Sequence, residues 1–126
     1  DTGLRNLAAA GLLVNEWTIT SGGQFAIRRV GSTVFLSLDV DKATASADTI
    51  TTLPAGFRPG VVTDAFIFTA GSSGANVVPG YIASAGTVLC YRSNMAGSLA
   101  HIHYNFQTTD AWPTSLPGSA SGSIPT

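Results

Sequence analysis

One stretch of sequence decides the fold: Gln24-Phe-Ala-Ile-Arg-Arg-Val30, Gly31-Ser32, Thr33-Val-Phe-Leu-Ser-Leu-Asp-Val40. In its second half, apolar side chains occupy every other position and therefore share one face of a strand. These are Val34, Leu36, Leu38 and Val40. The two-residue link carries glycine at its first position, as a type II′ turn prefers. The stretch therefore predicts a β-hairpin with one buried face.

Strand signals recur at short intervals on both sides of this hairpin, whereas helix signals are nearly absent. The further expected strands are Trp17–Thr20, Asp48–Leu53, Val61–Thr69, Val77–Ser84, Thr87–Tyr91 and Leu99–Thr109. The sequence predicts an all-β protein, an antiparallel β-sandwich or a jelly-roll-like barrel of about eight or nine short strands. Residues 1–126 are expected to form a single domain with an irregular C-terminal tail over residues 113–126, which is rich in proline and glycine.

Composition excludes several classes of protein. Hydrophobic residues make up 44% of the 126 residues and charged residues only 10%, which excludes a disordered chain. A net charge of -1 argues against a nucleic-acid partner, and no apolar run is long enough for membrane insertion. Serine and threonine make the surface polar without charge, which suits an extracellular or virion-exposed protein and equally a subunit of an oligomer.

Two further sequence features concern cysteine and the start of the chain. Cys90 is the single cysteine, so no intrachain disulfide forms, and its place on a strand predicts an inert core thiol. The chain begins at Asp1 and its one methionine is Met95. We therefore expect a segment of a longer protein, with a processed protein that has lost its N-terminus as the alternative.

Two of the expected strands are apolar on both faces. Val61–Thr69 carries large apolar side chains at consecutive positions, and in Thr33–Val40 the side chain of Phe35 lies opposite the Val34 face. A strand in a small β-protein should expose one polar face. A second apolar face therefore predicts a contact between subunits, with a central barrel strand covered by a loop as the alternative.

Four motifs together resemble the C-terminal head domains of bacteriophage tail fibres and minor tail proteins, especially those of phages that infect Gram-positive, actinobacterial hosts. The motifs are Asp1-Thr-Gly-Leu-Arg-Asn6, Ile27-Arg-Arg-Val-Gly-Ser-Thr-Val34, Leu53-Pro-Ala-Gly-Phe-Arg-Pro59 and Ala111-Trp-Pro-Thr-Ser-Leu-Pro-Gly118. Their order covers nearly the whole chain. The resemblance implies a homotrimeric β-sandwich head on the virion tail, in an extracellular position, that binds a glycan of the host cell surface.

On this interpretation the partners are the host glycan, two further copies of the chain and the rest of the tail fibre. Two alternatives remain open. The domain could be a purely structural trimerisation or capping domain, or a monomeric carbohydrate-binding module of a secreted enzyme. A capping domain would bind no cells, so replacing surface aromatic residues would leave cell binding unaffected. A carbohydrate-binding module would be monomeric, so the oligomeric state distinguishes it from a fibre head.

The Leu53–Pro59 and Ala111–Gly118 motifs also have a physical interpretation as a corner and a pinned tail. Proline ends or fixes the chain direction, glycine permits a left-handed turn, and an aromatic side chain fills the core or anchors the tail. The residues expected to have these structural roles are Pro54, Gly56, Phe57, Pro59, Trp112 and Pro113. Trp112 could alternatively stack on a sugar.

His101 and His103 share one face of their strand, and Asp39 and Asp41 share one face of another. In a parallel trimer the histidines could hold a metal ion, but ordinary surface positions or a receptor-binding role are favoured, and we expect no cofactor. Carboxylates two positions apart on a strand point in parallel and do not flank a substrate, so a glycosidase is disfavoured. No nucleophile elbow, phosphate loop or dinucleotide fingerprint is present, so we do not expect an enzyme.

Aromatic and polar residues together favour binding of sugars, because sugar rings stack on aromatic faces while their hydroxyl groups form hydrogen bonds. The amphipathic aromatic residues are Trp17, Tyr81, Tyr91, Tyr104 and Trp112. The candidate ligand-binding residues are Asp39, Asp41, Tyr91, Arg92, Asn94, His101 and His103. Arg28 and Arg29 point to opposite faces, and one of them is expected to be partly buried with Asp39, Asp41 or Asp64 as its partner.

Overall fold

The computed structural model describes residues 1–42, 49–71, 74–90 and 99–120. Within these ranges every regular element is a β-strand, so the protein is all-β as the sequence predicts. The strands are β1 (Arg5–Asn6), β2 (Trp17–Ile19), β3 (Phe25–Val30), β4 (Thr33–Lys42), β5 (Thr49–Thr52), β6 (Thr63–Gly71), β7 (Gly74–Ile82), β8 (Thr87–Cys90), β9 (Leu99–Gln107) and β10 (Ser119–Ala120). No helix long enough and apolar enough to cross a membrane occurs in the described ranges.

The β3–β4 hairpin has the expected register and turn. Val30 pairs with Thr33, and Gly31 takes a positive φ of 58°. Among the described non-glycine residues only Asn15 and Glu16 have a positive φ, so the turn places its left-handed residue at the glycine alone. A type II′ turn requires this pattern, which confirms the prediction.

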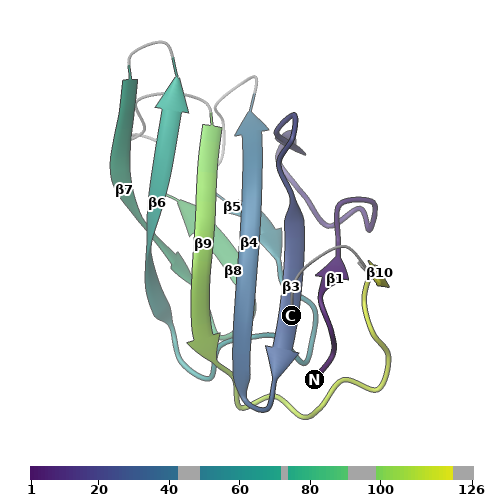
Figure 1. The fold of residues 1–126 in the computed structure, drawn as a ribbon. Helices are drawn as coiled ribbons and strands as arrows, with labels where there is room; N and C mark the ends of the chain where they lie inside the picture. The colour runs from purple at the N-terminus through teal and green to yellow at the C-terminus, as the bar shows by residue number, and fades with distance from the viewer. Residues whose placement is uncertain (43–48, 72–73, 91–98, 121–126) are drawn as a thin grey trace.

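Hydrogen bonds join the strands in the order β10-β1-β3-β4-β9-β6-β7-β8-β5, with β2 paired to β4 beside β3, and every pair is antiparallel. Figure 1 shows that this ribbon of strands curves back on itself, so that β5 and β8 lie behind β4 and β9. The result is a two-layered, sandwich-like arrangement. The antiparallel part of the fold prediction is confirmed.

The core lies between the two layers. The inward side chains of β4 are fully or almost fully buried, as their alternation predicts. They meet side chains from β3 and β9 in the front layer and from β5 and β8 behind. The central members are Phe25, Ile27, Val34, Leu36, Leu38, Val40, Ile50, Ile82, Val88, Cys90, Ala100, Ile102 and Phe106. Cys90 is buried, as expected for a core thiol.

The C-terminal tail is more regular than its composition indicates. Ser119–Ala120 forms β10 on β1, inside the segment expected to be irregular. Two hydrogen bonds hold the tail there, from the Arg5 guanidinium to the carbonyl oxygens of Pro117 and Gly118. Gly118 itself has a positive φ of 61°. A Cβ atom at Gly118 would overlap the carbonyl oxygen of Asn6, so only glycine fits this approach.

Of the two strands expected to be apolar on both faces, the one predicted over Val61–Thr69 begins two residues later. β6 starts at Thr63, and Val61 and Val62 precede it with exposed side chains, 72% and 58% accessible. Phe35 on β4 is 43% exposed and lies on the face away from the core, as its alternation with Val34 predicts. Large apolar side chains are therefore presented on the surface of the single chain.

Candidate functional site

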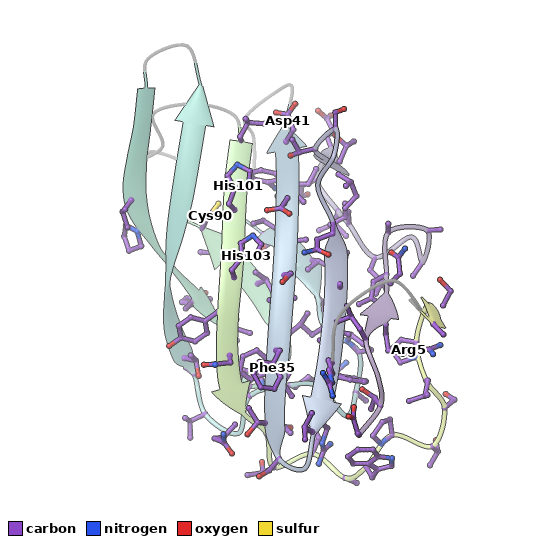
Figure 2. All side chains as sticks on the ribbon, viewed as in Figure 1. Arg5, Phe35, Asp41, Cys90, His101 and His103 are labelled. Atoms are coloured by element: carbon purple, nitrogen blue, oxygen red, sulfur yellow. The ribbon has the colours of Figure 1, made fainter. Side chains whose placement is uncertain are left out.

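Six side chains lie on the outer face of two central strands. Register pairs Phe35 with Asn105, Ser37 with His103, and Asp39 with His101 across β4 and β9. We call these six residues the β4–β9 strip. Figure 2 shows the labelled members Phe35, His101 and His103 along one face of the two strands. The strip brings together residues separated by more than sixty positions in the chain.

Asp39 is the centre of a hydrogen-bond network in the strip. One carboxylate oxygen, Oδ1, lies 2.8 Å from Nδ1 of His101 and 2.9 Å from Nε2 of His103. The other oxygen, Oδ2, accepts a 3.2 Å hydrogen bond from the backbone N–H of Gln24. Only 13% of the Asp39 side chain is exposed, against 34% for His101 and 53% for His103. The carboxylate is thus mostly buried, and the two imidazoles bound to it are accessible to solvent.

Two opposing effects act on the pKa of Asp39. Burial raises the pKa, but hydrogen bonds from His101, His103 and the Gln24 N–H, with the charge of His103, outweigh burial and hold the pKa below its ordinary value. Asp39 is therefore ionised at neutral pH and accepts hydrogen bonds only. Each histidine must then carry a proton on the nitrogen that faces Asp39, which fixes its tautomer.

The fixed tautomer determines what the strip offers to a ligand. In the neutral imidazoles the remaining nitrogens, Nε2 of His101 and Nδ1 of His103, are hydrogen-bond acceptors. Neither nitrogen has a hydrogen-bond partner within the described part of the chain. The histidine pair therefore presents acceptors suited to groups that donate, such as hydroxyl groups.

Replacing Asp39 by asparagine is expected to lower the free energy of unfolding at neutral pH by about 1 kcal/mol, because two imidazole donors lose an ionised acceptor. Since the folded pKa lies below the unfolded value, the carboxylate contributes stability above the unfolded pKa, and this contribution is lost as the pH falls through the folded pKa. Urea unfolding measured from neutral pH to below about pH 4 checks this. The curves of wild type and variant should converge in acid, and a constant difference would contradict the assignment.

A shallow groove of about 300 Å³ lies next to the network. It is lined by Phe35, Leu36, Ser37, His103, Tyr104 and Asn105. The half-exposed ring of Phe35 provides an apolar surface, and the Asn105 amide and the Ser37 hydroxyl supply polar groups at its edge. An aromatic ring beside hydrogen-bonding groups matches the chemistry of a sugar, which has an apolar C–H face and polar edges.

Of the other predicted ligand-binding residues, the structure describes Asp41 alone, and it does not belong to this strip. Asp41 lies nearer the end of β4, opposite Leu99 and Thr18 in register, and Figure 2 shows it beyond the histidines. Tyr91, Arg92 and Asn94 lie outside the described residues. Sequence reasoning treated the histidine pair and the aspartate pair as separate candidates, because nothing in the sequence indicates that β9 pairs with β4 in this register.

One nitrogen of each histidine is bound to Asp39, so only the outer nitrogens, Nε2 of His101 and Nδ1 of His103, are available to a metal ion. In the described ranges, no group of three or more His, Cys, Asp or Glu side chains has a geometry that could hold a metal ion.

A second cluster of contacts joins the two motifs that were expected to be structural. The Asp110 carboxylate accepts hydrogen bonds from the backbone N–H groups of Gly56, at 2.8 Å, and Arg58, at 3.2 Å. Gly56 has a φ of 96°, and a Cβ atom there would lie 2.9 Å from the Pro113 ring. Phe57 is fully buried. Pro59 is buried and Pro54 is half-buried in the same corner. We call this cluster the proline corner.

Two expectations about side chains at these sites are wrong. Arg29 is buried, but its partners are backbone carbonyl oxygens and the Trp112 ring instead of the carboxylates of Asp39 or Asp41. The side chain of Asp64 lies outside the described part of the structure. Trp17 is only 3% exposed and belongs to the core, so it presents no surface to a sugar.

Comparisons of the chain with protein-family models, with curated proteins and with solved structures found no match. The resemblance to phage tail-fibre heads therefore stays a prediction that rests on the four motifs.

Proposed function

We propose that this chain is a receptor-binding domain of a phage tail fibre and that it binds a saccharide of the host cell surface through the β4–β9 strip. One observation carries the proposal. The exposed Phe35 ring lies on the same outer face as His101 and His103, whose outer nitrogens are acceptors because Asp39 fixes their tautomers. This combination of an apolar platform and fixed acceptors suits a neutral, hydroxyl-rich ligand.

In the proposed complex, one sugar ring stacks on Phe35 through its C–H face. Its hydroxyl groups donate to the histidine nitrogens and exchange hydrogen bonds with Ser37 and Asn105. Residue pairs repeat about every 7 Å along two antiparallel strands, so the three register pairs of the strip extend far enough for a short oligosaccharide. The binding is reversible recognition, and the proposal includes no bond-breaking step.

Replacing Phe35 by alanine is expected to weaken saccharide binding about tenfold, because an aromatic contact of this kind contributes about 1–1.5 kcal/mol. Isothermal titration with soluble cell-wall polysaccharide prepared from actinobacterial cells measures the effect. Val14→Ala is the matched control, since it removes an exposed apolar side chain that belongs neither to the strip nor to the valines proposed below to join copies of the chain. Unchanged affinity in Phe35→Ala, with binding by the wild type, would contradict the assignment of the strip.

We also propose that the domain works as a homotrimer. The exposed Val61, Val62 and Val77 side chains, in a chain with only 10% charged residues, support contacts between copies. Light scattering on a sizing column is expected to give a mass three times the 12.9 kDa of the chain. Three sites on one fibre would then add avidity. A mass of one chain would contradict the trimer and favour the monomeric binding module.

A further inference from the structure

The proline corner contains a second concave site. A pocket of about 470 Å³ opens between residues 54–56 and 110–117, on segments distinct from those that form the β4–β9 strip. Its volume lies in the range of small-molecule sites in proteins, about 300–1,000 Å³. Trp112 lines this pocket and is 47% exposed, although a tryptophan that serves only as an anchor would be buried.

The Arg29 guanidinium packs against one face of the Trp112 ring. The Arg29 guanidinium lies over the ring, with its central carbon 5.0 Å from the ring centroid, within the range of a cation–π contact. Arg29 itself is fixed by hydrogen bonds to the carbonyl oxygens of Gly31 and Gly56, at 2.8 and 2.7 Å. Since Arg29 covers one face of the indole, the exposed area of Trp112 belongs to the other face and the edges.

The walls of the pocket are rigid and preformed. Pro54, Pro113 and Pro117 line it, and proline rings have no side-chain freedom to lose on binding. The Asp110 carboxylate ties the two walls together through the backbone N–H groups of Gly56 and Arg58. A pocket that already has its bound shape loses little entropy when a ligand enters.

The polar groups of the pocket favour a neutral ligand. The Arg29 guanidinium donates to backbone carbonyl oxygens, and the Asp110 carboxylate accepts from backbone N–H groups, so each charge already has its partners. Thr114 and Ser115, which carry hydroxyl groups, line the pocket, and both residues are exposed. A preorganised indole face beside two hydroxyl groups fits a ring with an apolar face and polar edges.

We propose that this pocket is a second saccharide-binding subsite, in which a pyranose ring stacks on the free face of Trp112 and forms hydrogen bonds with Thr114 and Ser115. The inference rests on the proposed function for the class of ligand. It adds a position on the surface, because the pocket is built from other segments of the chain than the strip. A saccharide chain held at both positions would bind more tightly than at either one.

Tryptophan fluorescence tests the proposal in the intact chain. The protein has two tryptophans, and Trp17 is 3% exposed, so acrylamide quenching reports mainly on Trp112. The probes are soluble actinobacterial wall polysaccharide and methyl glycosides of single sugars. We expect saccharide to protect Trp112 from acrylamide, and we expect this protection to persist in Phe35→Ala. Quenching that saccharide leaves unchanged would overturn the subsite.

Variants of the pocket give the second arm. Trp112→Ala is expected to weaken binding about five- to tenfold in calorimetry, whereas Trp112→Phe keeps a ring over Arg29 and should lose less. Because Trp112→Ala also removes the support of Arg29, the double variant Thr114→Val/Ser115→Ala tests the pocket without touching that contact. Wild-type affinity in both the alanine and the double variant would overturn the subsite.

The outcomes separate this subsite from the proposed function. Binding that is lost in Phe35→Ala but unchanged in the pocket variants supports the β4–β9 strip and overturns the subsite. Binding that is lost in the pocket variants but unchanged in Phe35→Ala supports the subsite and contradicts the strip. A wild-type protein that binds none of the probes contradicts both.

Discussion

Replacing the buried Arg29 by methionine should lower the free energy of unfolding by about 3–4 kcal/mol. The buried guanidinium donates to the carbonyl oxygens of Gly31, Gly56, Asp110 and Ala111. Methionine keeps much of the side-chain volume but leaves those oxygens without their donor, and an unsatisfied buried acceptor costs about 1–3 kcal/mol. Urea unfolding followed by far-UV circular dichroism measures the change.

Arg28 provides a matched control on the same strand. Its guanidinium pairs with the carboxylate of Asp1, which is 46% exposed, and exposed ion pairs contribute about 0–1 kcal/mol. Arg28→Met should therefore shift the urea midpoint only slightly. Equal shifts in the two variants would show that burial and carbonyl contacts do not distinguish the two arginines, contrary to the account of the proline corner.

Replacing Phe57 by alanine should destabilise the protein by about 3–5 kcal/mol, because a fully buried ring is removed from a corner that cannot collapse around the cavity. The corner is held by the hydrogen bonds from the Gly56 and Arg58 N–H groups to the Asp110 carboxylate, and Gly56 has a φ of 96°. Thermal unfolding by calorimetry measures the loss.

Phe35→Ala is the control for Phe57→Ala, since it makes the same change on a side chain that is 43% exposed. It should cost about 1 kcal/mol or less, because little apolar area returns to water. A large loss of stability in Phe35→Ala would mean that the ring stabilises the fold. A loss of binding in that variant would then reflect unfolding instead of a lost contact with the saccharide. A small loss in Phe57→Ala would contradict the rigid corner.

The strands that carry apolar alternation could be predicted from the sequence, because a two-residue period is written directly in the residue order. The β3–β4 hairpin is the clearest case, with its glycine in the left-handed position of the turn. The short strands β1 and β10 could not be predicted, because two residues carry no period. Their pairing depends on the Arg5 contacts to the tail and on the close approach at Gly118.

The candidate site was predicted in parts and not as a whole. His101, His103 and Asp39 were each singled out, but their union depends on the register between β4 and β9, which is a non-local property of the sheet. The partners of Arg29 were missed for a similar reason. A buried arginine needs hydrogen-bond acceptors, and backbone carbonyl oxygens serve as well as carboxylates. Because every residue has a backbone carbonyl, the sequence does not indicate which ones accept.

The most direct test of the β4–β9 strip is a nuclear magnetic resonance titration of the isotope-labelled chain with soluble actinobacterial wall polysaccharide. The account predicts that the backbone amide signals of Phe35, Ser37, His101, His103 and Asn105 shift together and saturate at one ligand concentration. A titration in which saccharide binds while these five signals stay in place would contradict it.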